Sequence, residues 1–269
     1  QKAEIINQRD EIELQRAIVE EKNKGLTDSI NYAKRIQYTL LAKKEFLKEN
    51  LPQHFIYFNP KDIISGDFYW ATKKNNKFFL AVCDSTGHGV PGAFMSLLNI
   101  GFLSEAINEK GILSPEKILN YAREQLIESV SKEGQRDGFD GILICIEEGS
   151  NTIKYASAHN SPILINNKGM VELPYDKMPV GFNENTISFN VHSIDVEKGD
   201  TIYLFTDGFA DQFGGIKGKK FMYKQLKKLL TDISSLPLEE QKFKLTGALN
   251  EWKGDLEQVD DVCVIGIKI

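Results

Sequence analysis

Several aspartates stand at the edges of short apolar segments that are far apart in the chain. Asp84 follows the apolar run 77–82 and precedes a loop with two glycines, Ser85-Thr86-Gly87-His88-Gly89, which leads into a helix-like segment. Asp67, Asp207 and Asp260 have similar settings. Apolar runs of this length are typical of buried strands, and carboxylate oxygens are the ligands that Mg²⁺ and Mn²⁺ prefer. The pattern predicts carboxylates that converge on a divalent cation.

Each aspartate taken alone has a simpler interpretation. Asp84 fits an ordinary strand-to-helix turn, and Asp207, in Thr206-Asp207-Gly208, fits an ordinary turn residue. Motifs of this length also occur by chance. The interpretation as one site therefore depends on their occurrence together.

In their order and spacing, these motifs resemble the SpoIIE/RsbU-type branch of the metal-dependent (PPM) serine/threonine protein phosphatases, from about residue 55 to residue 269. The motifs that carry the resemblance are Ser65-Gly66-Asp67-Phe68-Tyr69, Asp84-Ser85-Thr86-Gly87-His88-Gly89-Val90-Pro91, Ala158-His159-Asn160-Ser161-Pro162, Met178-Pro179-Val180-Gly181, Thr206-Asp207-Gly208 and Asp260-Asp261. The resemblance implies an α+β fold, a four-layer α-β-β-α sandwich. We expect this domain over residues 51–269, after a long helix or coiled coil in residues 1–50.

The resemblance also implies a reaction and its metal ligands. Two Mn²⁺ or Mg²⁺ ions would activate a water for attack on a phosphomonoester, with Asp84 shared between the ions. Asp207 and Asp260 would complete the coordination of the first ion, and Asp67 and the main-chain carbonyl of Ser85 would bind the second. Asp84 and Asp207 are thus the catalytic candidates. Neighbouring side chains on a strand point to opposite faces, so only one member of the Asp260-Asp261 pair should bind metal. The resemblance implies that it is the first.

Further polar residues are expected to line the cleft. They are Lys61, His88, Asp140, His159 and Asn160. For the two histidines a structural hydrogen-bonding role is an alternative. Asp137 and Asp140 either hold a third, weak metal ion or are solvated loop carboxylates. Relatives in the wider superfamily place an arginine before the first acidic motif to grip the substrate phosphate. No arginine is clearly placed for this role here, and Lys61 is a weak candidate substitute.

Composition narrows the class of protein. The chain has 269 residues, 33 of them basic and 38 acidic, for a net charge of −5, which argues against general nucleic-acid binding. We find no uninterrupted apolar run long enough to span a membrane and no signal peptide, so we expect no membrane contact within this sequence. Cys83, Cys145 and Cys263 lie in strand-like runs and are expected to be reduced thiols. These features predict a cytoplasmic protein or the cytoplasmic part of a larger, membrane-anchored sensor.

The first 50 residues are rich in Glu, Lys, Gln and Arg. Apolar residues recur there every seven positions, at Ile5, Ile12, Val19, Leu26, Ala33 and Leu40. A seven-residue repeat predicts a parallel dimeric coiled coil. The alternative is a single amphipathic helix folded back on its own domain. Gly25 would weaken a continuous helix by about 1 kcal/mol. We therefore expect a joint at Gly25 between a first helix and a second helix at 27–48.

The rest of the chain predicts alternating blocks of strands and helices. Expected strands are 55–58, 67–71, 77–82, 141–146, 152–156, 162–166, 187–194, 200–205 and 262–269. Expected helices run from about 92 to 109, from Pro115 onward, and over 219–230 and 238–252. A layered sandwich suits this order.

The predicted function is that of a phosphoserine/phosphothreonine phosphatase, the output domain of a larger signalling protein. The expected partner is a phosphorylated regulatory protein, such as an anti-sigma-factor antagonist. Two alternatives stay open: a catalytically silent dimeric binding module, and a phosphohydrolase of small phosphoesters.

Overall fold

The computed structural model describes residues 2–130, 137–184 and 187–269. Side chains are described from residue 7 onward, so the first expected seam position, Ile5, lies outside them. The helices are α1 (Lys2–Leu40), α2 (Lys44–Asn50), α3 (Gly89–Ser104), the π-helical turn η1 (Glu105–Glu109), α4 (Pro115–Ser129), α5 (Gly208–Asp211), α6 (Tyr223–Ile233) and α7 (Leu238–Lys253). The strands are β1 (His54–Asn59), β2 (Asp67–Lys74), β3 (Lys77–Ser85), β4 (Gly138–Glu147), β5 (Thr152–Ala158), β6 (Ile163–Asn166), β7 (Gly169–Glu172), β8 (Val180–Gly181), β9 (His192–Asp195), β10 (Thr201–Phe205), β11 (Phe213–Gly214), β12 (Lys219–Lys220) and β13 (Val262–Lys268).

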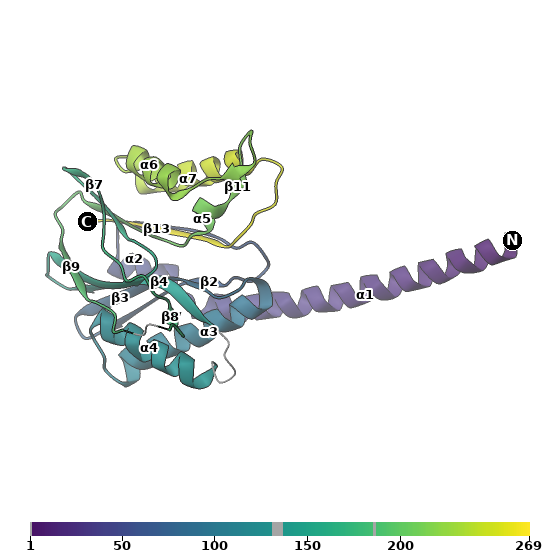
Figure 1. Ribbon diagram of the computed structural model, residues 1–269, viewed down its shortest axis with the longest axis horizontal. Coiled ribbons are helices and arrows are strands. Elements are labelled where there is room, and N and C mark those ends of the chain that lie inside the picture. Colours follow the sequence, from purple (N-terminus) through teal and green to yellow (C-terminus); the bar gives the residue numbers. More distant parts are fainter. Residues whose placement is uncertain (1, 131–136, 185–186) are drawn as a thin grey trace.

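Two antiparallel sheets form the centre of the molecule. One has the strand order β1-β13-β10-β6-β7, and the other has the order β2-β3-β4-β5-β9, with β8 added beside β4. Helices α6 and α7 cover the outer face of the first sheet, and α3 and α4 cover the outer face of the second (Figure 1). The four-layer α-β-β-α sandwich is therefore confirmed.

Two apolar clusters account for the layers. One lies under α6 and α7 and includes Tyr203, Leu226 and Leu245, all fully buried. The larger cluster fills the space between the sheets and the space under α3 and α4. Both faces of β3 and β4 are covered, which explains why these strands carry continuous apolar runs.

Helix α3 with η1, Gly89–Glu109, is apolar enough and long enough to cross a membrane by composition alone, with a mean hydropathy of 1.4 over its best window. It packs on β2 and β3, and residues such as Asn99, Ile100 and Leu103 are buried there. Its apolar character therefore serves to cover the sheet.

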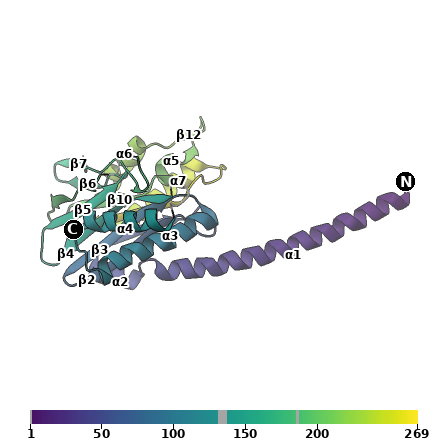
Figure 2. The same cartoon turned by 60° about the horizontal axis from the view of Figure 1, so that its bottom comes forward.

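The N-terminal segment is one continuous helix. Helix α1 runs through Gly25 without interruption and breaks only at Leu41–Lys43, so the expected joint at Gly25 is wrong. The helical residues on both sides of Gly25 stabilise the helix by more than this one glycine destabilises it. The first three quarters of α1 project away from the sandwich (Figures 1 and 2), so the helix does not fold back on its own domain. Four of the apolar side chains of α1 are more than half exposed: Ile12, Leu14, Val19 and Leu26.

The end of α1 behaves differently. Gln37 and Leu41 are buried against the sandwich, as is Leu47 of α2. The Ala42 N–H donates to the Tyr69 carbonyl at 3.3 Å, on the outer edge of β2. Contact between the N-terminal helices and the sandwich thus begins before residue 51.

Two expected elements are wrong in part. The strand expected at 187–194 is limited to β9, because side chains take up the main-chain groups before it: Arg123 donates to the Ile187 carbonyl at 2.8 Å, and Asn120 accepts from the Phe189 N–H at 3.2 Å. The helix expected at 219–230 begins only at Tyr223. Lys219–Lys220 forms the hairpin strand β12, and Met222, at φ 73°, separates the strand from the helix.

Candidate active site between the two sheets

Three carboxylates form a row across the second sheet. Asp67 on β2 lies directly opposite Asp84 on β3, and Asp84 lies directly opposite Asp140 on β4. Residues directly opposite on antiparallel strands project to the same face, with Cβ atoms roughly 5 Å apart. The sheet register therefore places three acids side by side.

The first sheet adds two more carboxylates from its own strand ends. Asp207 follows β10 and Asp260 precedes β13, and these strands are paired antiparallel. The end of one therefore lies beside the start of the other, and both face the row on the second sheet. The close approach here requires a glycine: a Cβ at Gly208 would collide with the Asp261 carbonyl.

A cleft of about 300 Å³ opens over this cluster. Of the residues expected at the site, Asp84, Ser85, His88, Asp140, His159 and Asp260 line it. Asp67 is fully buried behind the wall, where it accepts a hydrogen bond of 2.6 Å from the Thr206 hydroxyl. Asp207 is partly buried next to Asp84. Asn160 lines a neighbouring cavity instead, and Lys61 lies near Asp260 without lining the cleft.

The acids perturb one another electrostatically. Burial and the adjacent Asp84 raise the pKa of Asp67 well above its ordinary value, and burial and Asp207 do the same for the pKa of Asp84. Burial, together with the neighbouring Asp260, raises the pKa of Asp207 to about 6. Like charges this close disfavour one another's ionisation. A bound cation would relieve that repulsion.

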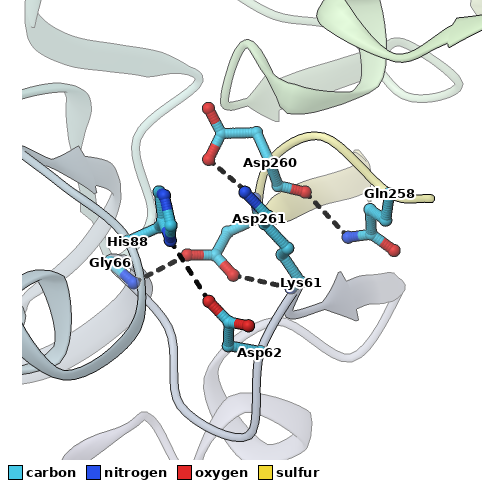
Figure 3. Close-up of polar contacts among 7 residues, drawn as sticks. All are labelled: Lys61, Asp62, Gly66, His88, Gln258, Asp260 and Asp261. Atoms are coloured by element: carbon cyan, nitrogen blue, oxygen red, sulfur yellow. Dashed lines mark hydrogen bonds and ion pairs between the residues drawn. The ribbon is translucent and has the colours of Figure 1, made fainter.

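The side chains of Asp260 and Asp261, which lie just before β13, point in different directions (Figure 3). Asp261 turns inward, is buried, and accepts hydrogen bonds of 2.7 Å from the N–H groups of both Lys61 and Gly66. Asp260 turns toward the cleft, and burial raises its pKa. Both oxygens of Asp261 accept main-chain hydrogen bonds, whereas within the described residues Asp260 uses only Oδ1, which accepts the Asp261 N–H at 2.8 Å. The choice of Asp260 as metal ligand stays a prediction.

Two histidines stand on the cleft wall, each beside an acid. His88 Nδ1 lies 3.2 Å from Asp62 Oδ2 (Figure 3), and His159 Nδ1 lies 2.9 Å from Asp140 Oδ1. His159 has a left-handed backbone, φ 56°. In a residue other than glycine this conformation costs of order 1–3 kcal/mol and is concentrated at functional sites. Of the two acids considered for a third ion, Asp140 lines the cleft and Asp137 does not.

The donor set fits a hard divalent cation, since it consists of carboxylates and a main-chain carbonyl. In the part of the chain that the structure describes, no three His, Cys, Asp or Glu side chains are grouped closely enough, as they stand, to hold a metal ion. The acids thus surround an open cleft and do not form a closed cage.

A second polar cluster, which we call the polar joint, lies behind the cleft. It consists of Gln37, Ser65, Gly66, Ser96 and Asp261. Gln37 Nε2 donates to the Ser65 carbonyl at 2.6 Å and to Ser96 Oγ at 2.8 Å, and its Oε1 accepts from the Ser65 N–H at 3.2 Å. The next residue, Gly66, binds Asp261 and precedes Asp67. Helix α1 is thereby connected to the first acidic strand through hydrogen bonds.

Sequence reasoning missed Gln37 and Thr206 as residues that support the site. Thr206 belongs to the motif Thr206-Asp207-Gly208, and its small hydroxyl could have been expected to orient a buried acid. Gln37 gives no such signal, because a glutamine in a helix rich in Glu, Lys and Gln is normally solvated.

Comparisons with known proteins agree with this geometry. The family model described as stage II sporulation protein E (SpoIIE) matches residues 74–269. The SiaA-PP2C domain of Pseudomonas aeruginosa has 29% sequence identity and a TM-score of 0.84, over 92% of this chain and 98% of that one. No curated protein matches the sequence.

More distant structures share the fold. The PP2C phosphatase domain and regulatory fragment of SpoIIE from Bacillus subtilis matches with 19% identity and a TM-score of 0.65, over 81% of this chain and 61% of that one. A PPM Ser-Thr phosphatase from Mycobacterium smegmatis, in complex with cacodylate, matches with 14% identity and a TM-score of 0.54, over 81% of this chain and 99% of that one.

Proposed function

The chain belongs to the SpoIIE family of PP2C-type phosphatase domains, and on that premise we propose that it is a metal-dependent phosphatase of phosphoserine and phosphothreonine in a regulatory protein. The observation that carries the proposal is the row of Asp67, Asp84 and Asp140, faced by Asp207 and Asp260 across the sheets. Carboxylates that raise one another's pKa have no structural benefit without a cation.

The acids would hold two Mn²⁺ or Mg²⁺ ions, with Asp84 central because it neighbours both Asp67 and Asp207. Asp260 and the Ser85 carbonyl complete the set. Such ions, when bound, supply Lewis acidity toward the phosphoryl oxygens and lower the pKa of a water. The hydroxyl of Thr206 fixes one oxygen of Asp67 and so orients the other. Asp140 is available for a third, weaker ion.

The cleft offers two groups for the substrate phosphate in place of the missing arginine. The N-terminus of α3 begins at Gly89, its first turn carries no acidic residue, and Thr86, Gly87 and His88 before it line the cleft. The N-terminal end of a helix attracts anions. Because Asp140 engages Nδ1 of His159, Nε2 is the ring nitrogen left to face a substrate oxygen.

Phosphate release from a phosphoserine peptide with Mn²⁺ present tests the proposal. We expect turnover by the native chain and its loss in Asp84→Asn and Asp207→Asn, while the exposed β9 variant Asp195→Asn keeps its activity. A folded chain that releases no phosphate from peptide, p-nitrophenyl phosphate or nucleotide would instead support the silent binding module. Release from the small esters alone would support the phosphohydrolase of small phosphoesters.

We also propose that α1 forms a parallel homodimer with a second copy. Its apolar side chains Ile12, Val19 and Leu26 recur at seven-residue spacing and are exposed along a helix that projects from the sandwich. Sedimentation should give a dimer, and removal of residues 1–26 should give a monomer. A dimer that persists after truncation would contradict this assembly. The polar joint gives the helix pair a connection to Asp67, so the truncation should also change activity per site.

The partner and the location follow from the same proposal. The substrate would be a phosphorylated regulator of the kind that an anti-sigma-factor antagonist represents. Three buried free thiols, Cys83, Cys145 and Cys263, suit the reducing cytoplasm.

A further inference from the structure

A second cavity of about 130 Å³ adjoins the acidic cleft. It lies between the β6–β7 region, the end of β10 and the start of α6. His159 lines both the cleft and this cavity, so the two are separated by one side chain. Nothing in the proposed reaction at the carboxylates uses it.

Asn160 is the unusual residue of this cavity. It is 7% exposed and lines the space. Its main-chain N–H donates to the Ala158 carbonyl, and its own carbonyl accepts from the Ser157 hydroxyl. Its side-chain amide makes no hydrogen bond to any described part of the chain. The amide borders the cavity, where it offers two donors and an acceptor. That combination complements a peptide group.

The opposite wall is aromatic. The rings of Phe205 and Tyr223 pack with centroids 6.2 Å apart, and Tyr175 also lines the space. The rim carries an ion pair of 2.7 Å between Lys227 and Glu172. Because these two charges satisfy one another, the cavity favours an apolar side chain over a charged one. Its volume suits a single side chain.

The two cavities are neighbours, because His159 forms part of the wall of both. An extended chain advances about 3.3–3.6 Å per residue. A substrate with its phosphoryl group in the cleft therefore brings the residue next to the phosphorylated one past His159 and to the second cavity.

From this geometry we propose that the cavity, which we call the flanking pocket, binds the apolar side chain of the residue adjacent to phosphoserine or phosphothreonine, and that Asn160 hydrogen-bonds the peptide group between them. This assignment rests on the proposed phosphatase function. It makes the chain selective for the sequence around the phosphorylated residue, since small phosphoesters reach only the cleft.

Rates on matched substrates test the flanking pocket. Two sets of phosphoserine peptides carry Leu, Gly or Asp on the N-terminal or the C-terminal side of the phosphoserine, and p-nitrophenyl phosphate serves as the small ester. For one of the two sides we expect the native chain to have a kcat/KM at least about tenfold higher for Leu than for Asp, the size of discrimination that an apolar pocket gives. Asn160→Asp, which keeps the shape, and Asn160→Ala should each lower the ratio of peptide to small-ester kcat/KM about tenfold. Asn76→Ala, in the β2–β3 turn, should not change the ratio.

The outcomes separate the two proposals. An active native chain with no preference for Leu on either side, or Asn160 variants with an unchanged ratio, overturns the flanking pocket alone. A native chain that releases phosphate from none of these substrates overturns the phosphatase function and the pocket with it. A lowered ratio in Asn76→Ala would show that the ratio responds to general destabilisation and would also count against the pocket.

Discussion

The polar joint and the acidic cleft are adjacent, since Gly66 of the joint precedes Asp67 of the cleft, and their buried polar groups have opposite surroundings. In the joint, the carboxylate of Asp261 accepts two main-chain N–H groups, and the amide of Gln37 has a partner for both its oxygen and its nitrogen. In the cleft, carboxylates face other carboxylates and their pKa values rise. The joint therefore stabilises the fold, whereas the carboxylates of the cleft repel one another, a repulsion that a bound cation would relieve. Adjacent residues, Asp260 and Asp261, belong to the two different regions.

The largest expected effect is on turnover by Asp84→Asn. The amide keeps the size of the carboxylate but loses the charge that holds a cation, so kcat/KM toward a phosphoserine peptide should fall at least about a thousandfold, or about 4 kcal/mol in activation free energy. Denaturant unfolding in EDTA should show the variant to be at least as stable as the native chain, because it has lost a repulsive charge. A variant that is unfolded in EDTA would mean that Asp84 is structural, and the contrast between the regions would fail.

The same substitution at the two adjacent acids should have opposite effects on stability. In Asp261→Asn, an NH₂ group replaces an oxygen that accepts a main-chain N–H, so the free energy of unfolding should fall by about 1–3 kcal/mol. In Asp260→Asn the amide oxygen can keep the hydrogen bond that this carboxylate accepts from the Asp261 N–H at 2.8 Å, while a repulsive charge is lost. Metal-free stability should therefore be unchanged or raised, and activity should weaken instead. Chemical denaturation in EDTA compares them directly. Equal losses of stability in both variants would contradict the division.

Gln37→Leu tests whether the joint connects α1 to the cleft. The variant removes three hydrogen bonds and leaves the buried Ser65 N–H and carbonyl unpaired, which should lower the free energy of unfolding by about 1–3 kcal/mol. If the joint positions Asp67, the Mn²⁺ concentration for half-maximal activity should also rise. The exposed neighbour variant Tyr38→Leu serves as the control. A stability loss without any change in the Mn²⁺ requirement would limit Gln37 to a structural role.

The smallest effect concerns pH. Folding raises the pKa of Asp207 from 3.8 to about 6, and the pKa of Asp84 rises in the same direction. Between these values the folded chain binds more protons than the unfolded chain, so metal-free stability should decrease as pH rises from about 4 to about 6. Saturating Mn²⁺ should reduce or reverse that slope. Melting temperatures across this range with EDTA and with Mn²⁺ test the sign, and a metal-free stability that increases with pH would contradict it.

The family resemblance carried the prediction of the four layers. Apolar runs and turn residues, which are local signals, allowed prediction of the strand ends that carry Asp67, Asp84, Asp207 and Asp260. The row with Asp140 depends on which strands pair and in which register, which no local pattern specifies. The segment 187–191, which was expected to be a strand, shows the same limit. Its apolar residues do alternate, but Arg123 and Asn120 on α4 bind the Ile187 carbonyl and the Phe189 N–H, which a neighbouring strand would otherwise pair. Asn160 was predicted to line the cleft. In the structure it lines the neighbouring cavity instead, which the sequence pattern could not show.

The most direct test of the central claim is to count bound Mn²⁺ by electron paramagnetic resonance at neutral pH. We predict two bound ions per native chain, with the spectrum of two neighbouring ions, and loss of that spectrum in Asp84→Asn but not in Asp195→Asn. A native chain that binds no Mn²⁺ at millimolar concentration, or an Asp84→Asn chain that binds it as the native chain does, would contradict the assignment of the cleft as a metal-dependent active site.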